Sequence, residues 1–406
     1  MKVAYYSPFP PERTGISEYS ELLVPALARR IELEVVPRGA TRDADVGLYH
    51  VGNNPDAHGW IVEALRRRPG VVVLHDFVLH HLVAGLTLGR RDGPGYLGAM
   101  QREAGVPGRL LAHGVLDGIV PPLWEVRPED FPLAGEVLEH AAKPGGGLIV
   151  HSRYVAERAV ASGYDGRLWR IPHPAWPDPG VAAEDVSGEP VVGCFGNINA
   201  SKRIPQLLEA FAALRSIHPD ARLLLVGADL EARLSQSALD GVERIEYVDE
   251  PRLWKLMGAC DFCVSLRAPT MGETSGSAIR ALVLGKPLVV SDVGWFAELP
   301  DDVALKVPVD AHEAQTLAAA LELLAGDTAA RAAMSAAARD YVRREHDLDR
   351  VAEAYVAALE EAAGAEVVRD AVVGEVAEAA AGVGIAAEGD EAAEIARLLN
   401  EVRLGG

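Results

Sequence analysis

The strongest constraint on this chain is a repeated alternation of short apolar runs with segments of helical spacing. In the first half the apolar runs lie at residues 3–6, 31–36, 46–51, 71–74, 147–150 and 168–171. Helical patterns lie at about 17–30, where Pro25 is expected to cause a kink, at about 56–68, and from residue 153 onward. Continuous apolar runs of this length are typical of parallel strands that helices cover on both faces. The first half is therefore predicted to be one doubly wound α/β unit.

The same alternation restarts after a proline-rich segment. Residues 172–190 contain five prolines, which is typical of a linker between domains. Beyond it, strands are predicted at 191–195, 222–226, 244–248, 261–266 and 288–291, and helices at about 204–217, 250–258 and 277–284. With 406 residues, the chain is also too long for one ordinary core. We therefore expect two Rossmann-like doubly wound domains that face each other across a cleft.

The domains are predicted at residues 1–175 and 176–345. A helix at about 346–364 is a candidate to return to the first domain. Residues 365–406 are rich in Ala and Glu and contain no aromatic residue, so a separate helical tail is predicted there.

Charge and composition limit the classes of partner and compartment. The formal net charge of −20 excludes nucleic acid as a general partner, because binding to phosphate backbones needs a basic face. No apolar run reaches the length of a membrane-spanning helix, and the first one ends before Pro8, too short for a signal peptide. Cys260 and Cys263 have the spacing of a zinc or redox pair, but no second pair exists. With Cys194 they are interpreted as core residues in a reducing cytoplasm.

The first candidate functional segment follows the strand at 191–195. Gly196 and Asn197 open a turn that leads through Lys202 and Arg203 into a helix. Free backbone amides, the helix dipole and two positive side chains favour a phosphate there. An ordinary strand-to-helix turn with surface basic residues explains this segment equally well.

The second candidate segment precedes the helix at 277–284. Gly272, Glu273, Thr274, Ser275 and Gly276 combine small residues, hydroxyls and one carboxylate before a helix start. Such a group can bind an anion with its amides and sugar hydroxyls with its carboxylate. The alternative is a capped helix start, which explains Glu273 or Ser275 but not the whole group.

Two further candidates come from the first half, since ligands bind at the carboxyl ends of parallel strands. Gly15 lies where backbone would approach a ligand across the cleft, although a plain capped turn is equally consistent. His75 ends the strand at 71–74 and is placed to donate to substrate oxygen or take a proton. His75, His80 and His81 lack the spacing of a helical zinc pair, so no metal site is predicted.

These four segments, in their order along the chain, resemble the retaining glycosyltransferases of family 4, which have the GT-B fold. The resemblance covers roughly residues 1–362 and is sharpest from 192 to 300. Its motifs lie at 196–203, 223–227, 269–276 and 281–292, with weaker agreement at 7–16, 150–154 and 171–174.

The resemblance implies transfer of a sugar from a nucleotide-diphosphate sugar to a hydroxyl acceptor, with anomeric retention and no metal. The nucleotide sugar is then a co-substrate, and no other cofactor is expected. By position, Lys202 would bind the diphosphate, Glu273 the donor sugar, and His75 the sugar near the reacting centre. The remaining expected donor contacts are Gly15, Gly196, Asn197, Arg203, Gly227, Gly272, Thr274, Ser275, Gly276 and Arg280.

This sequence departs from the family pattern twice. Asn197 stands where the family usually has an arginine, for which Arg203 is a candidate replacement. Arg280 stands where the family has a second glutamate that holds the nucleotide ribose. Arginine has only donors and cannot accept a bond from a hydroxyl, although it could bind phosphate.

The predicted reaction is front-face attack by the acceptor hydroxyl, with the leaving phosphate taking its proton. The alternatives are a nucleotide-sugar epimerase and a non-catalytic nucleotide-sugar-binding subunit of the same fold. A nicotinamide oxidoreductase ranks last, since no Gly-x-Gly-x-x-Gly follows the first strand.

The acceptor is expected to be a glycan, a lipid-linked molecule or a small molecule, as in polysaccharide biosynthesis. The helical stretch at 78–138 is expected to shape the acceptor side. Weak membrane association and homo-oligomerisation stay open.

Overall fold

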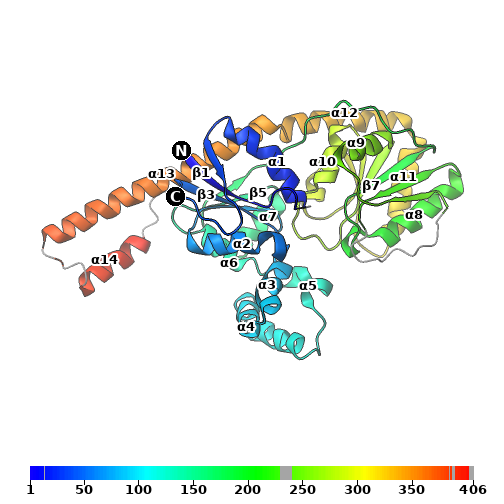
Figure 1. Ribbon diagram of the computed structural model, residues 1–406. Helices are drawn as coiled ribbons and strands as arrows, with labels where there is room; N and C mark the ends of the chain where they lie inside the picture. The colour runs from blue at the N-terminus through cyan, green and yellow to red at the C-terminus, as the bar shows by residue number, and fades with distance from the viewer. Residues whose placement is uncertain (13, 229–239, 384, 386–388, 402–406) are drawn as a thin grey trace.

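The computed structural model describes residues 1–12, 14–228, 240–383, 385 and 389–401. Within this part of the chain, the strands form two parallel sheets of six strands each (Figure 1). The first has the order β2-β1-β3-β4-β5-β6 and the second β12-β11-β10-β7-β8-β9. The predicted pair of doubly wound α/β units is therefore observed.

The first sheet consists of β1 (Lys2–Tyr6), β2 (Glu32–Val35), β3 (Val46–Val51), β4 (Val71–Leu74), β5 (Gly147–Val150) and β6 (Leu168–Arg170). Every residue of β3, β4 and β5 is buried, because helices cover both faces. One face packs on α1 (Gly15–Ala28) and α13 (Leu348–Gly382). The other packs on α2 (Pro55–Arg67), α6 (Gly135–Ala141) and α7 (Arg153–Ala161).

The second sheet consists of β7 (Val191–Phe195), β8 (Arg222–Val226), β9 (Val242–Ile245), β10 (Phe262–Ser265), β11 (Leu288–Ser291) and β12 (Ala304–Val307). One face packs on α9 (Glu250–Ala259), α10 (Gly276–Val283) and α12 (Thr328–Glu345). The other packs on α8 (Ile204–Ile217) and α11 (Glu313–Gly326). Cys194, Cys260 and Cys263 are free and buried in these cores, as expected.

A small helical unit is inserted between β4 and β5. It contains α3 (His80–Thr87), α4 (Gly93–Leu116) and α5 (Leu123–Val126), and it extends below the first sheet in Figure 1. Short 3-10 turns lie at Leu88–Arg90 and Pro128–Asp130. The unit has a core of its own around Tyr96 and Met100. Such an insertion reaches beyond the carboxyl edge of the sheet without disturbing strand order.

The chain crosses back to the first sheet at its C-terminal end. α12 lies on the second sheet, and the first part of α13 packs against α1 of the first. Farther along, α13 and α14 (Asp390–Glu401) project away from both sheets (Figure 1). No helix in the described part of the chain is long and apolar enough to cross a membrane.

Four elements differ from the sequence expectation. α13 runs unbroken from Leu348 to Gly382, across the boundary predicted between a helix at 346–364 and a separate tail. β9 begins two residues before the predicted 244–248 run and ends earlier. β12 was not predicted, because its alternation around Lys306 is short and half-exposed. α1 continues through Pro25, whose ring lies on the exposed side of the helix.

Candidate functional site

A cavity of about 880 Å³ lies between the carboxyl ends of the two sheets. Both halves of the chain contribute to its wall, as predicted for a cleft between doubly wound domains. The predicted site residues that line it are Gly15, His75, Gly196, Asn197, Gly227, Glu273, Thr274, Gly276 and Arg280. The other four, Lys202, Arg203, Gly272 and Ser275, do not line it.

Two glycines form the turn at the end of β7 and β8. Gly196 has a φ of +97° and Gly227 a φ of +149°. A Cβ on Gly227 would lie 2.3 Å from the backbone oxygen of Gly196. Only glycine fits where these two strand ends approach so closely. The resulting turn exposes backbone to the cavity, which suits contact with a phosphate.

Lys202 lies directly beneath this turn. Its side chain is buried, and its ammonium donates a hydrogen bond to the backbone oxygen of Phe195. A Cβ on Gly196 would lie 2.9 Å from the Lys202 nitrogen. Burial lowers the pKa of Lys202 to about 8. Lys202 thus places a positive charge behind the glycine turn, at the position where the sequence predicted a phosphate ligand.

Arg203 does not line the cavity and pairs instead with a residue of α11. It adopts a left-handed backbone conformation with a φ of +56°, and its guanidinium pairs with the buried carboxylate of Glu313 on α11. This pair anchors the start of α8 to α11. The predicted direct contact of Arg203 with a donor phosphate is therefore not what the structure shows. The partner is 110 residues away in sequence, so no local pattern indicated it.

The loop before α10 serves both the cavity and the contact between the domains. The Met271 carbonyl accepts hydrogen bonds from the amides of Phe77 and Val78, at 2.7 and 3.0 Å. Gly272 packs on the same segment, where a Cβ would lie 2.8 Å from the Phe77 Cβ. Gly272 therefore allows the two halves to approach and is not on the cavity wall.

Ser275 caps α10, and its side chain accepts a hydrogen bond from the Ala278 amide at 3.3 Å. The capped-helix interpretation thus holds for this residue. Its neighbours Thr274 and Gly276 do line the cavity, and within the described residues the buried Thr274 hydroxyl has no hydrogen-bond partner. The helix start accordingly presents free amides to the cavity.

The Glu273 carboxylate is held in place on both oxygens. Oε1 pairs with Arg267 at 2.7 Å. Oε2 accepts bonds from the Met271 amide at 2.7 Å and the Thr270 hydroxyl at 3.1 Å. A carboxylate held this firmly at the cavity wall is suited to accept from ligand hydroxyls with little reorganisation.

On the opposite wall, His75 lies in a cluster of buried rings. Its Nε2 is 3.0 Å from Nδ1 of His50, and the Tyr19 ring meets it edge-on with ring centres 4.8 Å apart. Burial holds the pKa of His75 well below its usual value. The imidazole is therefore neutral at pH 7 and can act as a hydrogen-bond donor or acceptor, depending on its tautomer.

Asp76, the next residue, also lines the cavity. Its Oδ2 accepts a hydrogen bond from the Asn53 amide at 2.8 Å. Loss of hydration and the nearby charge of Glu273 raise the pKa of Asp76 to about 7. Asp76 was not among the residues predicted for the site. Nor were His50, His151 and Arg267, although His151 follows β5 as His75 follows β4, a positional signal that could have been used.

Arg280 lies at the far end of the cavity wall with its side chain only 5% exposed. Its guanidinium stacks on Trp176, 3.5 Å from the ring centre. It pairs with Glu18 of α1 at 2.8 Å and with Glu250 of α9 at 3.4 Å. Arg280 is thus already neutralised by two carboxylates, one from each half of the chain.

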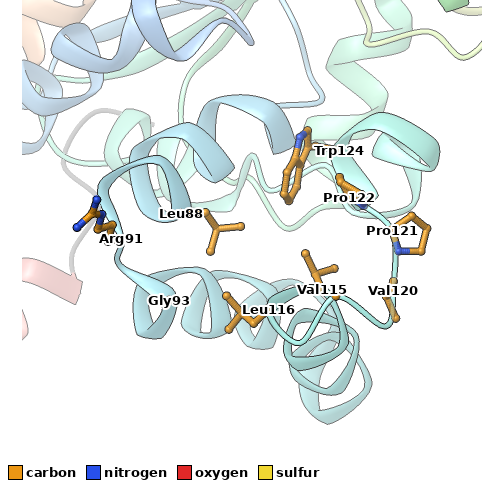
Figure 2. Close-up of a pocket in the computed structure, with 10 residues that line it drawn as sticks. Leu88, Arg91, Gly93, Val115, Leu116, Val120, Pro121, Pro122 and Trp124 are labelled. Atoms are coloured by element: carbon orange, nitrogen blue, oxygen red, sulfur yellow. The ribbon is translucent and has the colours of Figure 1, made fainter.

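A second cavity of about 630 Å³ lies inside the helical insertion. Figure 2 shows Leu88, Val115, Leu116 and Trp124 around it, with Arg91 at one side. It shares no lining residue with the main cavity. In the described part of the chain, no group of three or more His, Cys, Asp or Glu side chains is arranged to hold a metal ion.

Comparison with known proteins agrees with this geometry. Residues 189–327 match the family model described as Glycosyl transferases group 1. Over 168 residues the chain is 29% identical to D-inositol 3-phosphate glycosyltransferase of Jonesia denitrificans. The match spans 38% of this chain and only 39% of the length of that curated relative.

Solved structures resemble nearly the whole chain. Anabaena HepE in complex with UDP-glucose has a TM-score of 0.58 and 16% identity, covering 89% of this chain and 99% of that one. Sucrose-phosphate synthase from Thermosynechococcus elongatus has a TM-score of 0.57 and 18% identity, covering 87% and 96%. The predicted GT-B fold and the resemblance to GT-B glycosyltransferases are therefore confirmed. Assignment to retaining family 4 stays a prediction.

Proposed function

We propose that this chain transfers a sugar, of hexose type, from a nucleotide-diphosphate sugar to a hydroxyl acceptor, with retention of anomeric configuration and without a metal. One observation carries the proposal. The glycine turn above Lys202 and the start of α10 face His75 and Asp76 across a single cavity. Two supporting comparisons are the family match over 189–327 and the fold shared with HepE, which was solved with UDP-glucose.

In this proposal the diphosphate lies against Gly196, Gly227 and the first amides of α10. Lys202 supplies positive charge behind the turn, and the helix dipole adds to it. Both stabilise the negative charge that develops on the leaving phosphate as the anomeric bond breaks. Asn197, on the same wall, can offer its side-chain amide where a charged residue is absent.

The sugar then lies between Glu273 on one wall and His75 with Asp76 on the other. These groups orient its hydroxyls, and the acceptor hydroxyl attacks from the side of the leaving phosphate, which takes the proton. The helical insertion borders this region through His81, which lines the cavity. We propose that the insertion shapes the site of a glycan, lipid-linked or small-molecule acceptor, and that the reaction takes place in the cytoplasm.

The first test is a thermal-shift screen against UDP, GDP, ADP and TDP sugars, followed by transfer assays with the donor that binds. Lys202→Ala is expected to lower turnover about a hundredfold or more, the scale of losing one charge-stabilising group. Near-normal turnover would remove Lys202 from the donor site. Conversion of the donor without any acceptor would instead indicate an epimerase, and binding without turnover would indicate a non-catalytic subunit.

A further inference from the structure

Arg280 occupies the position at which the family resemblance predicts a ribose-binding carboxylate. An arginine cannot accept hydrogen bonds from ribose hydroxyls. The inference that follows rests on the proposed function, because it concerns how the same cavity holds the nucleotide part of the donor.

The surroundings of Arg280 do not favour a phosphate. Its guanidinium is buried against Trp176 and bonded to Glu18 and Glu250. One positive charge between two carboxylates leaves a surplus of negative charge. A phosphate would be repelled there, whereas hydroxyl groups, which donate hydrogen bonds, would be attracted.

Glu250 has a free acceptor at this point. It is the first residue of α9, it lines the cavity, and its side chain is 52% exposed. Arg280 and the Trp254 indole both bond to Oε1, the latter at 3.3 Å. Among the described residues no partner is bonded to Oε2. Arg280 and Trp254 therefore orient the carboxylate while one of its oxygens stays available.

Position favours Glu250 over Glu18. Glu250 belongs to the same half of the chain as Gly196, Gly227 and Gly276, so its spacing from a bound diphosphate does not depend on the contact between the halves. Arg280 follows Gly276 by four residues, about 6 Å along α10, a separation comparable to that between a phosphate and the ribose attached to it. Glu18 lies on α1 of the other half and reaches Arg280 only across the cleft.

We propose that Glu250, positioned by Arg280, accepts the hydrogen bonds of the ribose hydroxyls. The carboxylate that the family places on the α10 helix is thus supplied here from the start of α9. Arg280 acts as a positioning residue that orients the Glu250 carboxylate. Its guanidinium also pairs with Glu18 from the other half of the chain.

The test uses the full chain and isothermal titration with the nucleoside diphosphate that binds most tightly among UDP, GDP, ADP and TDP. If that nucleotide is UDP, GDP or ADP, its 2′-deoxy and 3′-deoxy forms are titrated as well. If it is TDP, which lacks the 2′-hydroxyl, its ribo form is titrated as well. The native chain is expected to bind the complete ribose about tenfold or more tightly, the scale of one lost hydrogen bond to a charged group. In Glu250→Ala this preference is expected to disappear. Glu18→Ala, the matched control, is expected to keep it.

The outcomes separate the two proposals. If Glu250→Ala still prefers the complete ribose as the native chain does, or if Glu18→Ala loses that preference, the assignment to Glu250 is overturned while the proposed function stands. If the native chain binds none of the four diphosphates, the proposed function and this inference both fall. Circular dichroism of each variant checks that the fold is retained.

Discussion

The phenol oxygens of Tyr19 and Tyr355 lie 2.6 Å apart in a buried hydrogen bond between α1 and α13. The two residues are 336 positions apart in sequence. Tyr19 also meets His75 and His173 edge-on, with ring centres 4.8 and 4.7 Å away. The returning helix therefore supports the ring cluster that forms one wall of the main cavity.

Tyr355→Phe is expected to lower the free energy of unfolding by about 1–3 kcal/mol, because the Tyr19 hydroxyl then loses its buried partner. Urea unfolding measures the change. Tyr341→Phe is the control, since that ring is only partly buried, and it is expected to change stability by about 0.5 kcal/mol or less. Equal effects of the two substitutions would contradict a stabilising role for the Tyr19 bond.

Nucleotide affinity is expected to decrease as the pH rises through about 8. The pKa of Lys202 is lowered to about 8 by burial, so the free protein loses this charge just above neutral pH. An anionic ligand prefers the charged form, and its affinity falls as that form disappears. Titration calorimetry from pH 7 to 9 measures the slope. Lys202→Met is neutral at every pH, so it is expected to bind the nucleotide weakly, with an affinity that changes little with pH. A nucleotide affinity that is constant from pH 7 to 9 in the native chain would contradict a role for the Lys202 charge.

The contribution of Asp76 to stability is expected to fall as the pH rises from about 4 to 7. Its pKa is raised from 3.8 to about 7 in the folded state. In this window the unfolded chain is ionised at Asp76 while the folded chain holds the proton, so raising the pH favours unfolding.

Asp76→Asn removes this titration. The free energy of unfolding of the variant, relative to that of the native chain, should therefore be higher at pH 8 than at pH 5 by about 1 kcal/mol or more. Thermal melts at the two pH values provide the measurement. Asp178→Asn, on the exposed linker, serves as the control and should leave the pH dependence as it is. A native-like pH dependence in Asp76→Asn would show that Asp76 is not its source.

Removal of residues 365–406 is expected to leave nucleotide affinity and melting temperature unchanged. Among the side chains of α13 that the structure describes, Ala362 is the last buried one, and none of those at 372–382 is buried. A longer truncation that removes α13 from Leu348 onward is expected to destabilise the first sheet strongly, since it exposes the core beneath α1. Loss of affinity in the shorter form would assign the tail a role in the site.

Most of the fold could be predicted from local patterns. Buried parallel strands require continuous apolar runs, and the runs at 46–51, 71–74 and 191–195 coincide with β3, β4 and β7. The prediction failed at edges, where one face is half-exposed and the apolar signal weakens. β9 and β12 both lie at the outer ends of the second sheet, and these are the strands that depart most from the prediction.

The site could be predicted only in part. Gly196, Gly227 and His75 line the cavity, as expected, because a residue at the carboxyl end of a parallel strand has its location set by the strand itself. The outcome was different for the long basic side chains of Arg203, which precedes α8, and Arg280, in the last turn of α10. Each bonds to carboxylates that no local pattern connects with it, Glu313 for one and Glu18 with Glu250 for the other.

The sequence by itself determined the two α/β halves, the linker between them and the strand ends that meet at the cavity. These depend on short-range periodicity and on glycine, whose conformational freedom acts at a single position. The tertiary structure decided which polar side chains line the cavity and which charged side chains form ion pairs with other residues. Which side chains pair depends on charges that the fold brings together from distant parts of the chain. Arg280, for example, pairs with one glutamate from each half.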